Sequence, residues 1–133
     1  MKTLNAIIVD DEELGRKNLE QLLKDYCPEV RVAGMAKSVV EARQLVFKHR
    51  PEIVFLDIHM PRATGFDLLN SLEERDFATI FVTAYRDFGI KALKAGALDY
   101  LMKPVDFREL QLAVHKVYRQ LNDRRNTRPP LAP

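Results

Sequence analysis

The sequence predicts a doubly wound α/β domain, in which a parallel β-sheet lies between two layers of helices. Five short apolar runs alternate along the chain with five amphipathic segments, and four of the runs are almost continuously apolar. Parallel strands covered by helices have this character, because neither face of such a sheet meets water. The chain has 133 residues, enough for one domain with its own hydrophobic core. The apolar runs are residues 6–9, 30–35, 53–56, 80–82 and 98–102.

The segments between these runs have the spacing of helices with one apolar face. Apolar residues recur three and four positions apart, which places them on one side of a helix. Ser38 with Glu41, and Asp106 with Glu109, have the spacing of a capping box, which predicts where the second and fifth helices begin. The predicted inward residues are Leu19, Leu22, Leu23 and Tyr26, then Val39, Ala42 and Val46, then Phe66, Leu69 and Leu72, then Phe88, Ala92 and Ala95, and finally Phe107, Leu110, Val114, Val117 and Leu121.

Strict alternation of strands and helices predicts right-handed crossovers and a parallel sheet. Two strand orders suit this length: a Rossmann half and the flavodoxin-like (βα)5 order 2-1-3-4-5. A G-x-G-x-x-G run after a strand would favour the Rossmann half, and the sequence contains no such run. We therefore expect the five-stranded flavodoxin-like sheet.

We expect residues 1–122 to form the domain and residues 123–133 to form a tail. The tail is polar and proline-rich, which suits either a linker to an effector domain absent from this chain or a natural terminus that frays. The single cysteine, Cys27, rules out a disulfide within the chain and favours a reducing compartment. We see neither a signal peptide nor a run of roughly 20 apolar residues, so we expect a cytoplasmic location without membrane binding. The net charge of +2 gives no general argument for binding a polyanion.

Carboxylates are predicted to gather at one edge of the sheet. Asp10 and Asp11, followed by Glu12, end the first strand, and Asp57 ends the third. In the order 2-1-3-4-5 these two strands are neighbours where the strand order reverses, which is where such sheets bind ligands. Like charges at close range raise one another's pKa unless a cation intervenes, and an oxygen-only site suits Mg²⁺, or Mn²⁺ in its place. The alternative is an acidic strand end exposed to water.

Thr83 and Lys103 end the fourth and fifth strands and complete the predicted site. Alone, such a threonine is usually structural and such a lysine is usually solvated. Beside the acids, a hydroxyl donor and an ammonium group suit a phosphoryl group on a carboxylate, which carries nearly two negative charges. A metal would neutralise the oxygens on its other side and ease in-line attack by the carboxylate of Asp57. The sequence thus predicts phosphoryl chemistry on Asp57.

Four stretches, IIVDDEE, FLDIHMPRATGFDLL, FVTAY and GALDYLMKPVD, follow one another with matching spacing. Through them residues 4–121 resemble the receiver domain of bacterial response regulators, the CheY-like superfamily. The resemblance implies that Asp57 is the phospho-acceptor. It implies that Asp11, Asp57 and the backbone carbonyl of His59 bind the metal directly, and that Asp10 binds it through water.

The same resemblance implies a switch rather than an enzyme. Thr83 is then the hydroxyl that moves toward the phosphoryl group, and Tyr100 is the aromatic residue whose rotamer follows it. Lys103 pairs with the phosphoryl group, and its peptide bond to Pro104 is expected to be cis. The phosphoryl donor is a phosphohistidine of a sensor histidine kinase.

Within the superfamily, the stretch IFVTAYRDFGIKALKAGALDYLMKPVD resembles LytTR-type (LytR/AlgR) transcription regulators. DNA binding is therefore expected only through a C-terminal domain that this chain lacks. The face made by the fourth helix, the fifth strand and the fifth helix, near Tyr100, is the expected output and homodimer surface.

Three other functions are less consistent with the residues. Phosphatases and dehalogenases with an aspartate nucleophile usually have a second aspartate two residues later, where this chain has His59, and they need a cap domain. An interaction module that has lost phosphorylation would not need the full set of acids, hydroxyl and lysine. A flavodoxin-like electron carrier would have a phosphate-binding loop after the first strand. His59 and Tyr85 flank the path of a hydrolytic water and bear on the dephosphorylation rate, in a direction that the sequence leaves open.

Overall fold

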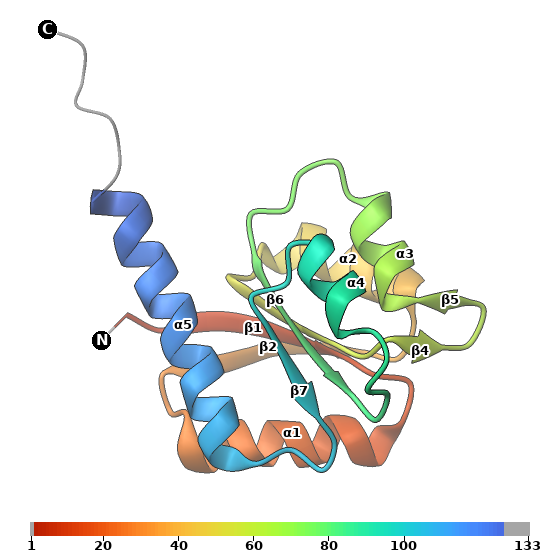
Figure 1. The fold of residues 1–133 in the computed structure, drawn as a ribbon, viewed down its shortest axis with the longest axis horizontal. Coiled ribbons are helices and arrows are strands. Elements are labelled where there is room, and N and C mark those ends of the chain that lie inside the picture. Colours follow the sequence, from red (N-terminus) through yellow and green to blue (C-terminus); the bar gives the residue numbers. More distant parts are fainter. Residues whose placement is uncertain (1, 127–133) are drawn as a thin grey trace, which may run out of the picture.

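The structure, a computed structural model, describes residues 2–126 and has a five-stranded parallel sheet at its centre (Figure 1). The strand order is β2-β1-β3-β6-β7, and every pairing in this sheet is parallel. Numbered within this sheet alone, the order is 2-1-3-4-5, so the predicted flavodoxin-like fold is confirmed. The strands are β1 (Leu4–Val9), β2 (Val30–Ala36), β3 (Ile53–Leu56), β6 (Ala78–Thr83) and β7 (Asp99–Met102).

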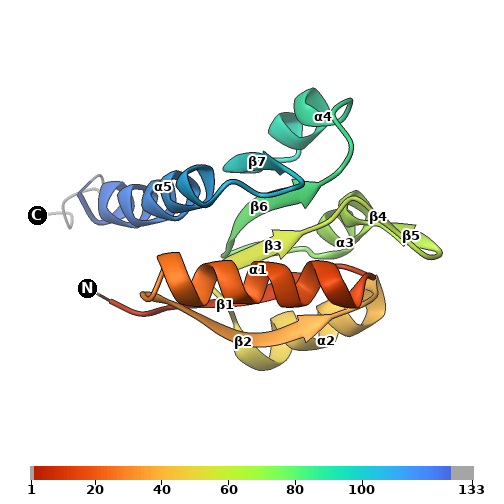
Figure 2. The ribbon, with the colours of Figure 1, turned by 90° about the horizontal axis from the view of Figure 1, so that it is seen from below.

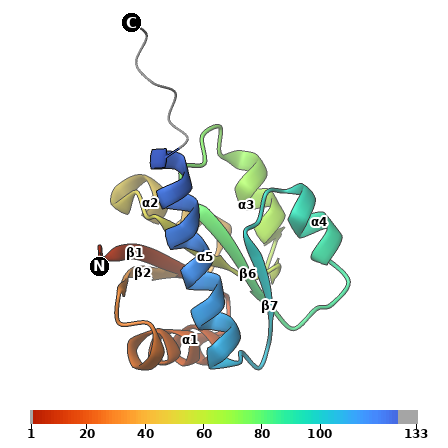
Figure 3. The ribbon, with the colours of Figure 1, turned by 60° about the vertical axis from the view of Figure 1, so that its left-hand side comes forward.

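Five helices within residues 2–126 cover the two faces of the sheet (Figures 2 and 3). Two of them pack with one cluster of buried side chains, and the other three pack with a second cluster on the opposite face. Within residues 2–126, none of the helices combines the length and the apolar character that crossing a bilayer would require. The first layer holds α1 (Glu13–Tyr26) and α5 (Phe107–Asn126), and the second holds α2 (Val39–His49), α3 (Gly65–Ser71) and α4 (Gly89–Lys94).

Strand β1 shows why the strand runs are continuously apolar. Ala6 and Ile8 belong to the cluster under α1 and α5, whereas Ile7 and Val9 belong to the cluster under α2, α3 and α4. Successive side chains of a strand point to opposite faces, and here both faces are covered. All four side chains are therefore buried.

The helix starts follow the capping prediction only in part. The hydroxyl of Ser38 accepts a hydrogen bond from the amide of Glu41 at 3.2 Å, but the Glu41 carboxylate accepts from the amide of Lys37 rather than from that of Ser38. In α5, Asp106 accepts from the amide of Arg108 instead of from that of Glu109. A complete capping box, which the sequence reading missed, opens α3, where Thr64 and Asp67 bond each other's amides.

Helix α5 is longer than predicted. It continues to Asn126, past the expected boundary at residue 122. Neither glycine nor proline occurs between Leu121 and Asn126, so nothing in that stretch breaks a helix, and the first proline is Pro129. The remainder of the predicted tail, residues 127–133, lies outside the described residues.

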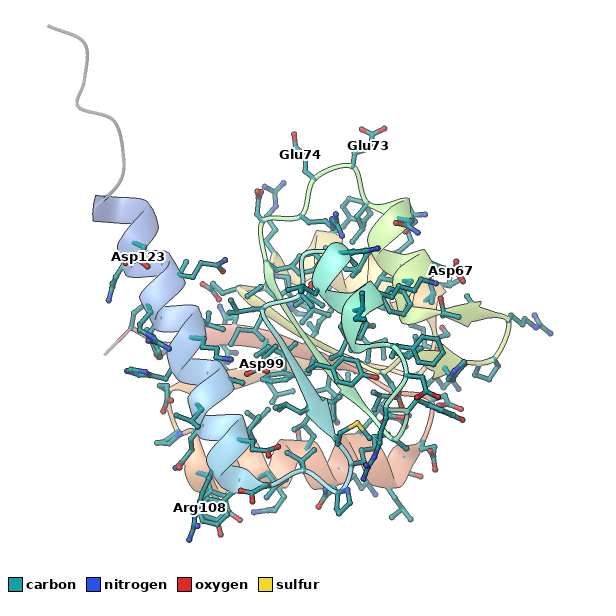
Figure 4. All side chains as sticks on the ribbon, viewed as in Figure 1. Asp67, Glu73, Glu74, Asp99, Arg108 and Asp123 are labelled. Atoms are coloured by element: carbon teal, nitrogen blue, oxygen red, sulfur yellow. The ribbon has the colours of Figure 1, made fainter. Side chains whose placement is uncertain are left out.

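Two predicted core residues lie at the surface between α1 and α5. Tyr26 is 39% exposed, and its ring stacks on that of Phe107 with the centroids 4.3 Å apart. The guanidinium of Arg108, labelled in Figure 4, lies over the other ring of this pair, 5.5 Å from the centroid of Phe107. Tyr26 is the last residue of α1, and Phe107 is the first residue of α5. The two rings therefore join the helix ends instead of entering the core.

A small antiparallel hairpin follows β3, made of β4 (His59–Met60) and β5 (Ala63–Thr64). Arg62 lies in its turn with a φ of 71°, in the left-handed region. Strands of two residues are too short to have a periodicity, so the sequence gives no signal for them. The hairpin lies directly beyond Asp57 and forms one side of the site described below.

Cys27 provides a simple test of the packing between α1 and the sheet. Its side chain is fully buried, and this burial, with a smaller effect of Glu29, raises the pKa of its thiol to about 11. We expect a disulfide exchange reagent to modify the native protein at neutral pH about 100-fold more slowly than the unfolded chain, because the thiolate is the nucleophile. The reaction in concentrated guanidinium chloride is the control. Similar rates in both conditions would mean that the end of α1 is not packed as described.

Candidate functional site

Four parallel strands bring the predicted site residues to one edge of the sheet. Asp10 follows β1, Asp57 follows β3, Thr83 is the last residue of β6, and Lys103 follows β7. Parallel strands have their carboxyl ends at the same edge, so residues far apart in sequence become neighbours there. Of these four, the side chains of Asp10, Asp57 and Lys103 make direct contact.

Lys103 joins two buried carboxylates. Its Nζ lies 2.7 Å from Oδ2 of Asp10 and 2.9 Å from Oδ2 of Asp57. Asp10 is 5% exposed and Asp57 is 6% exposed, while the side chain of Lys103 keeps 23% of its surface in contact with solvent. The three ionised groups sum to one negative charge, so the site retains an attraction for a further cation.

Burial and the ion pairs act in opposite directions on the pKa values. Burial raises the pKa of Asp57, and the hydrogen bond and charge of Lys103 offset this only in part. Burial lowers the pKa of Lys103, but its hydrogen bonds to Asp10 and Asp57 outweigh burial and the pKa is raised. Lys103 is therefore protonated at neutral pH, and the cost of desolvating the carboxyl group of Asp57 is compensated only in part.

Carboxylate oxygens of Asp10, Asp11 and Glu12 lie within 4.8 Å of one another. Asp57 lies outside this group, and its two oxygens accept from the amide of Ile58 at 2.7 Å and from Lys103 at 2.9 Å. Such hard oxygen donors, some of them exposed, suit Mg²⁺, which keeps several of its waters when bound. The residues therefore fit the metal that the sequence suggested.

A cleft of about 300 Å³ opens over Asp57. Four of the predicted residues line it, whereas Asp10 and Thr83 are buried and do not belong to its lining. A second hollow of about 260 Å³ lies at the opposite edge of the sheet, before β3 and β6, away from the predicted residues. The lining of the cleft over Asp57 is Asp11, Glu12, Asp57, His59, Met60, Pro61, Ala84, Tyr85 and Lys103.

Thr83 is fully buried, and its hydroxyl does not contact Asp57. Oγ1 instead accepts a hydrogen bond from the amide of Tyr85 at 3.3 Å. The carbonyl of the same Tyr85 accepts a hydrogen bond from the hydroxyl of Tyr100. The backbone of Tyr85 thus connects the two residues that the resemblance names as the switch.

Three aromatic side chains, His59, Tyr85 and Phe88, contact one another beside the cleft, and we call them the aromatic rim; His59 and Tyr85 line the cleft itself. The ring centroid of His59 lies 4.2 Å from that of Tyr85 and 5.4 Å from that of Phe88. The rim joins the β4–β5 hairpin to the loop between β6 and α4. The sequence indicated His59 and Tyr85 at this place and predicted Phe88 as an inward residue of the fourth helix. Phe88 does pack against the core at the start of α4, and its contact with His59 has no signal in the spacing.

Three local features involve the backbone at the strand ends. The guanidinium of Arg16 donates to the carbonyl of Asp10 at 2.8 Å, a contact without a sequence signal, since a basic residue in the first turn of a helix is usually solvated. A Cβ at Gly65 would lie 2.4 Å from the carbonyl oxygen of Asp57, so only glycine allows α3 to approach so closely. The peptide bond between Lys103 and Pro104 is cis, as the resemblance implies.

The comparisons with known proteins agree with this geometry. A family model described as the response regulator receiver domain matches residues 6–115. The chain belongs to this family. Among curated relatives, the transcriptional regulatory protein BtsR of Escherichia coli K12 is 38% identical over 110 residues, which is 81% of this chain and 45% of that protein. An uncharacterized response regulatory protein of Vibrio cholerae is 36% identical over 118 residues, which is 88% of this chain and 49% of that protein.

This receiver domain thus spans about half the length of the curated relatives that it matches. Solved structures share its fold. The receiver domain of AraT from Geobacillus stearothermophilus has a TM-score of 0.80 at 27% identity, covering 92% of this chain and 98% of that one. The response regulator domain of Thermotoga maritima CheB has a TM-score of 0.76 at 26% identity, covering 91% and 98% of the two chains.

Replacing Lys103 should destabilise the receiver domain. In Lys103→Ala, Asp10 and Asp57 would remain buried with no cation between them. Breaking a fully buried pair usually costs more, but the side chain of Lys103 is 23% exposed, so we expect a loss of about 2–3 kcal/mol in the free energy of unfolding. Urea denaturation at neutral pH measures it. The exposed Lys17, which pairs with Glu13 in the same helix, is the matched control, and Lys17→Ala should cost less than about 0.5 kcal/mol.

The stabilising contribution of Lys103 should also depend on pH. Because the pKa of Lys103 is raised above its ordinary value of 10.5, its contribution is complete below that pH. The contribution disappears as the pH rises through the folded-state pKa, so wild type and Lys103→Ala should converge in alkaline solution. Equal stability of the two proteins at neutral pH would contradict the ion-pair description.

Proposed function

We propose that this receiver domain accepts a phosphoryl group on Asp57 and acts as a switch rather than as an enzyme. The observation that carries the proposal is the placement of Asp57. Its carboxylate opens into a polar cleft at the end of the central strand, with the ammonium group of Lys103 at 2.9 Å. A nucleophilic carboxylate beside a cation that can follow the charge of a phosphoryl group is the arrangement that phosphoryl transfer requires.

In the proposed reaction, an oxygen of Asp57 attacks the phosphorus atom of a phosphohistidine on a sensor histidine kinase. The new phosphorus–oxygen bond forms as the phosphorus–nitrogen bond breaks, and the imidazole leaves with the electron pair. Lys103 keeps its proton and turns its ammonium group to the phosphoryl oxygens. Asp10, Asp11, Asp57 and the backbone carbonyl of His59 would hold Mg²⁺, or Mn²⁺ in its place, which neutralises charge on the transferred group.

The proposed signal passes through the backbone of Tyr85. A phosphoryl group on Asp57 offers acceptor oxygens to the hydroxyl of Thr83, which in the described state accepts from the amide of Tyr85. Movement of Thr83 toward these oxygens releases that amide, and the hydrogen bond between Tyr85 and Tyr100 then changes with the loop. Contacts that exist only in the phosphorylated state shift the balance between two conformations.

The proposed output surface is the face formed by α4, β7 and α5. Ile90 and Leu93 of α4 are each 74% exposed. Asp99 of β7, labelled in Figure 4, pairs with Lys116 of α5 at 3.0 Å and ties these two elements together. An apolar surface on α4 beside a charged one suits a homodimer that forms when the switch is active.

We further propose that the parent protein is a cytoplasmic transcription regulator of the LytTR type. The support is the resemblance of residues 80–106 to that group, together with the relative BtsR, which is named a transcriptional regulatory protein. DNA binding would then belong to a C-terminal domain outside this chain, since this chain spans about half of such relatives.

Phosphorylation can be measured directly by intact mass. Incubation with acetyl phosphate and Mg²⁺ should add one phosphoryl group, and size-exclusion chromatography of the product should report on dimerisation. Asp57→Asn and a sample with EDTA should both lack the adduct, because the first removes the nucleophile and the second removes the metal. An unmodified wild-type protein under all conditions, with Mg²⁺ binding also absent by calorimetry, would contradict the proposal and favour a pure interaction module.

The aromatic rim should lengthen the lifetime of the phosphoryl group. Tyr85 and His59 are in ring contact beside Asp57 and narrow the approach of a hydrolytic water. We expect Tyr85→Ala to hydrolyse its acyl phosphate at least about threefold faster than wild type. A threefold faster rate corresponds to a barrier lower by about 0.7 kcal/mol. Loss of phosphate over time by mass spectrometry measures it. Tyr26→Ala, at a distant surface position, should retain the wild-type rate, and an unchanged or slower rate in Tyr85→Ala would exclude shielding.

A further inference from the structure

We propose that Gly15 is a positioning residue for this site. Because Gly15 lacks a side chain, the carboxylate of Asp10 can occupy the position in which it pairs with Lys103 and binds Mg²⁺. The inference rests on the proposed function, because it concerns the metal that the reaction needs. Gly15 is the third residue of α1 and lies beside the end of β1.

The space at Gly15 is filled by one functional group. A Cβ built at Gly15 would lie 2.4 Å from Oδ2 of Asp10 and 3.1 Å from its Cγ. Cβ atoms essentially never come within 3.0 Å of such an atom, so any other residue at this position requires a shift. The two glycines near α4 differ in this respect, since a Cβ at Gly89 or Gly96 would meet nothing within 4 Å.

The backbone of Asp10 is held, so its carboxylate is the part that would move. The amide of Asp10 donates to the carbonyl of Ala36 at 3.0 Å, and its carbonyl accepts from Arg16 at 2.8 Å. The carboxylate has two partners of its own: Oδ1 accepts the amide of Glu12 at 2.9 Å, and Oδ2 accepts from Lys103 at 2.7 Å. A methyl group at position 15 would push Oδ2 away from α1 and disturb both of these hydrogen bonds.

Helix propensity does not account for the glycine. Alanine is the better helix former, and Gly15 does not have the left-handed backbone that would require glycine. Gly15→Ala should therefore favour α1 as a helix while it displaces the neighbouring carboxylate. These two effects have opposite signs in the free energy of unfolding, so stability is a poor readout and metal affinity is the informative one.

The test is the Mg²⁺ dissociation constant of the full chain, measured by calorimetry. We expect Gly15→Ala to bind Mg²⁺ about tenfold more weakly than wild type, which is the smaller end of the usual effect of residues that orient a metal ligand. Gly89→Ala, also a glycine-to-alanine change in the first turn of a helix, is the matched control and should retain the wild-type affinity.

A double-mutant cycle shows whether the effect passes through Asp10. In an Asp10→Ala background the displaced carboxylate is gone, so Gly15→Ala should no longer change Mg²⁺ affinity. If Gly15→Ala binds Mg²⁺ as wild type does, or weakens binding equally in both backgrounds, the inference is wrong. Thermal melting followed by circular dichroism verifies that each variant is folded.

A metal-free measurement separates this inference from the proposed function. The amide proton of Glu12 donates to Oδ1 of Asp10, so its NMR resonance should move upfield in Gly15→Ala and stay in place in Gly89→Ala. An unmoved resonance in Gly15→Ala would overturn the inference. If wild type itself fails to bind Mg²⁺, the proposed function fails, while a moved Glu12 resonance would still support the positioning of Asp10 by Gly15.

Discussion

The ammonium group of Lys103 pairs with both Asp10 and Asp57, and so links the ends of three separate strands, β7, β1 and β3. Two carboxylates this deeply buried would repel each other without a cation between them. The ammonium group makes their proximity tolerable, yet the three groups together keep a net negative charge. The site therefore retains an attraction for a further cation, which suits a domain whose proposed activity depends on Mg²⁺.

The surroundings of this ion pair are built from close approaches of the backbone. Gly65 allows α3 to lie against the carbonyl of Asp57, and Gly15 allows α1 to lie against the carboxylate of Asp10. In both places a helix begins beside a strand end that carries an acid. The acids are therefore positioned by packing of main chain and helix, and side-chain hydrogen bonds then orient their oxygens.

The loop between β6 and α4 connects the cleft with the outer face of the domain. The amide of Tyr85 donates to Thr83, its carbonyl accepts from Tyr100, and its ring contacts that of His59, which follows β3. Further ring contacts run from Phe88 through Phe66 and Phe81 to Tyr100. Ring packing and hydrogen bonds thus share this loop, which joins the strand end of β6 to α4 and β7.

The sequence by itself determined the sheet, its strand order and the edge at which the acids gather. The sheet follows from apolar periodicity, its strand order from the absence of a G-x-G-x-x-G run, and the edge from the rule that parallel strands end together. Only the tertiary structure decided that Lys103 pairs with Asp10 as well as Asp57, that Thr83 faces Tyr85, and that Gly15 leaves room for Asp10. These contacts join residues of different elements at distances of a few ångströms, and a spacing along one chain carries no information about which side chains meet there.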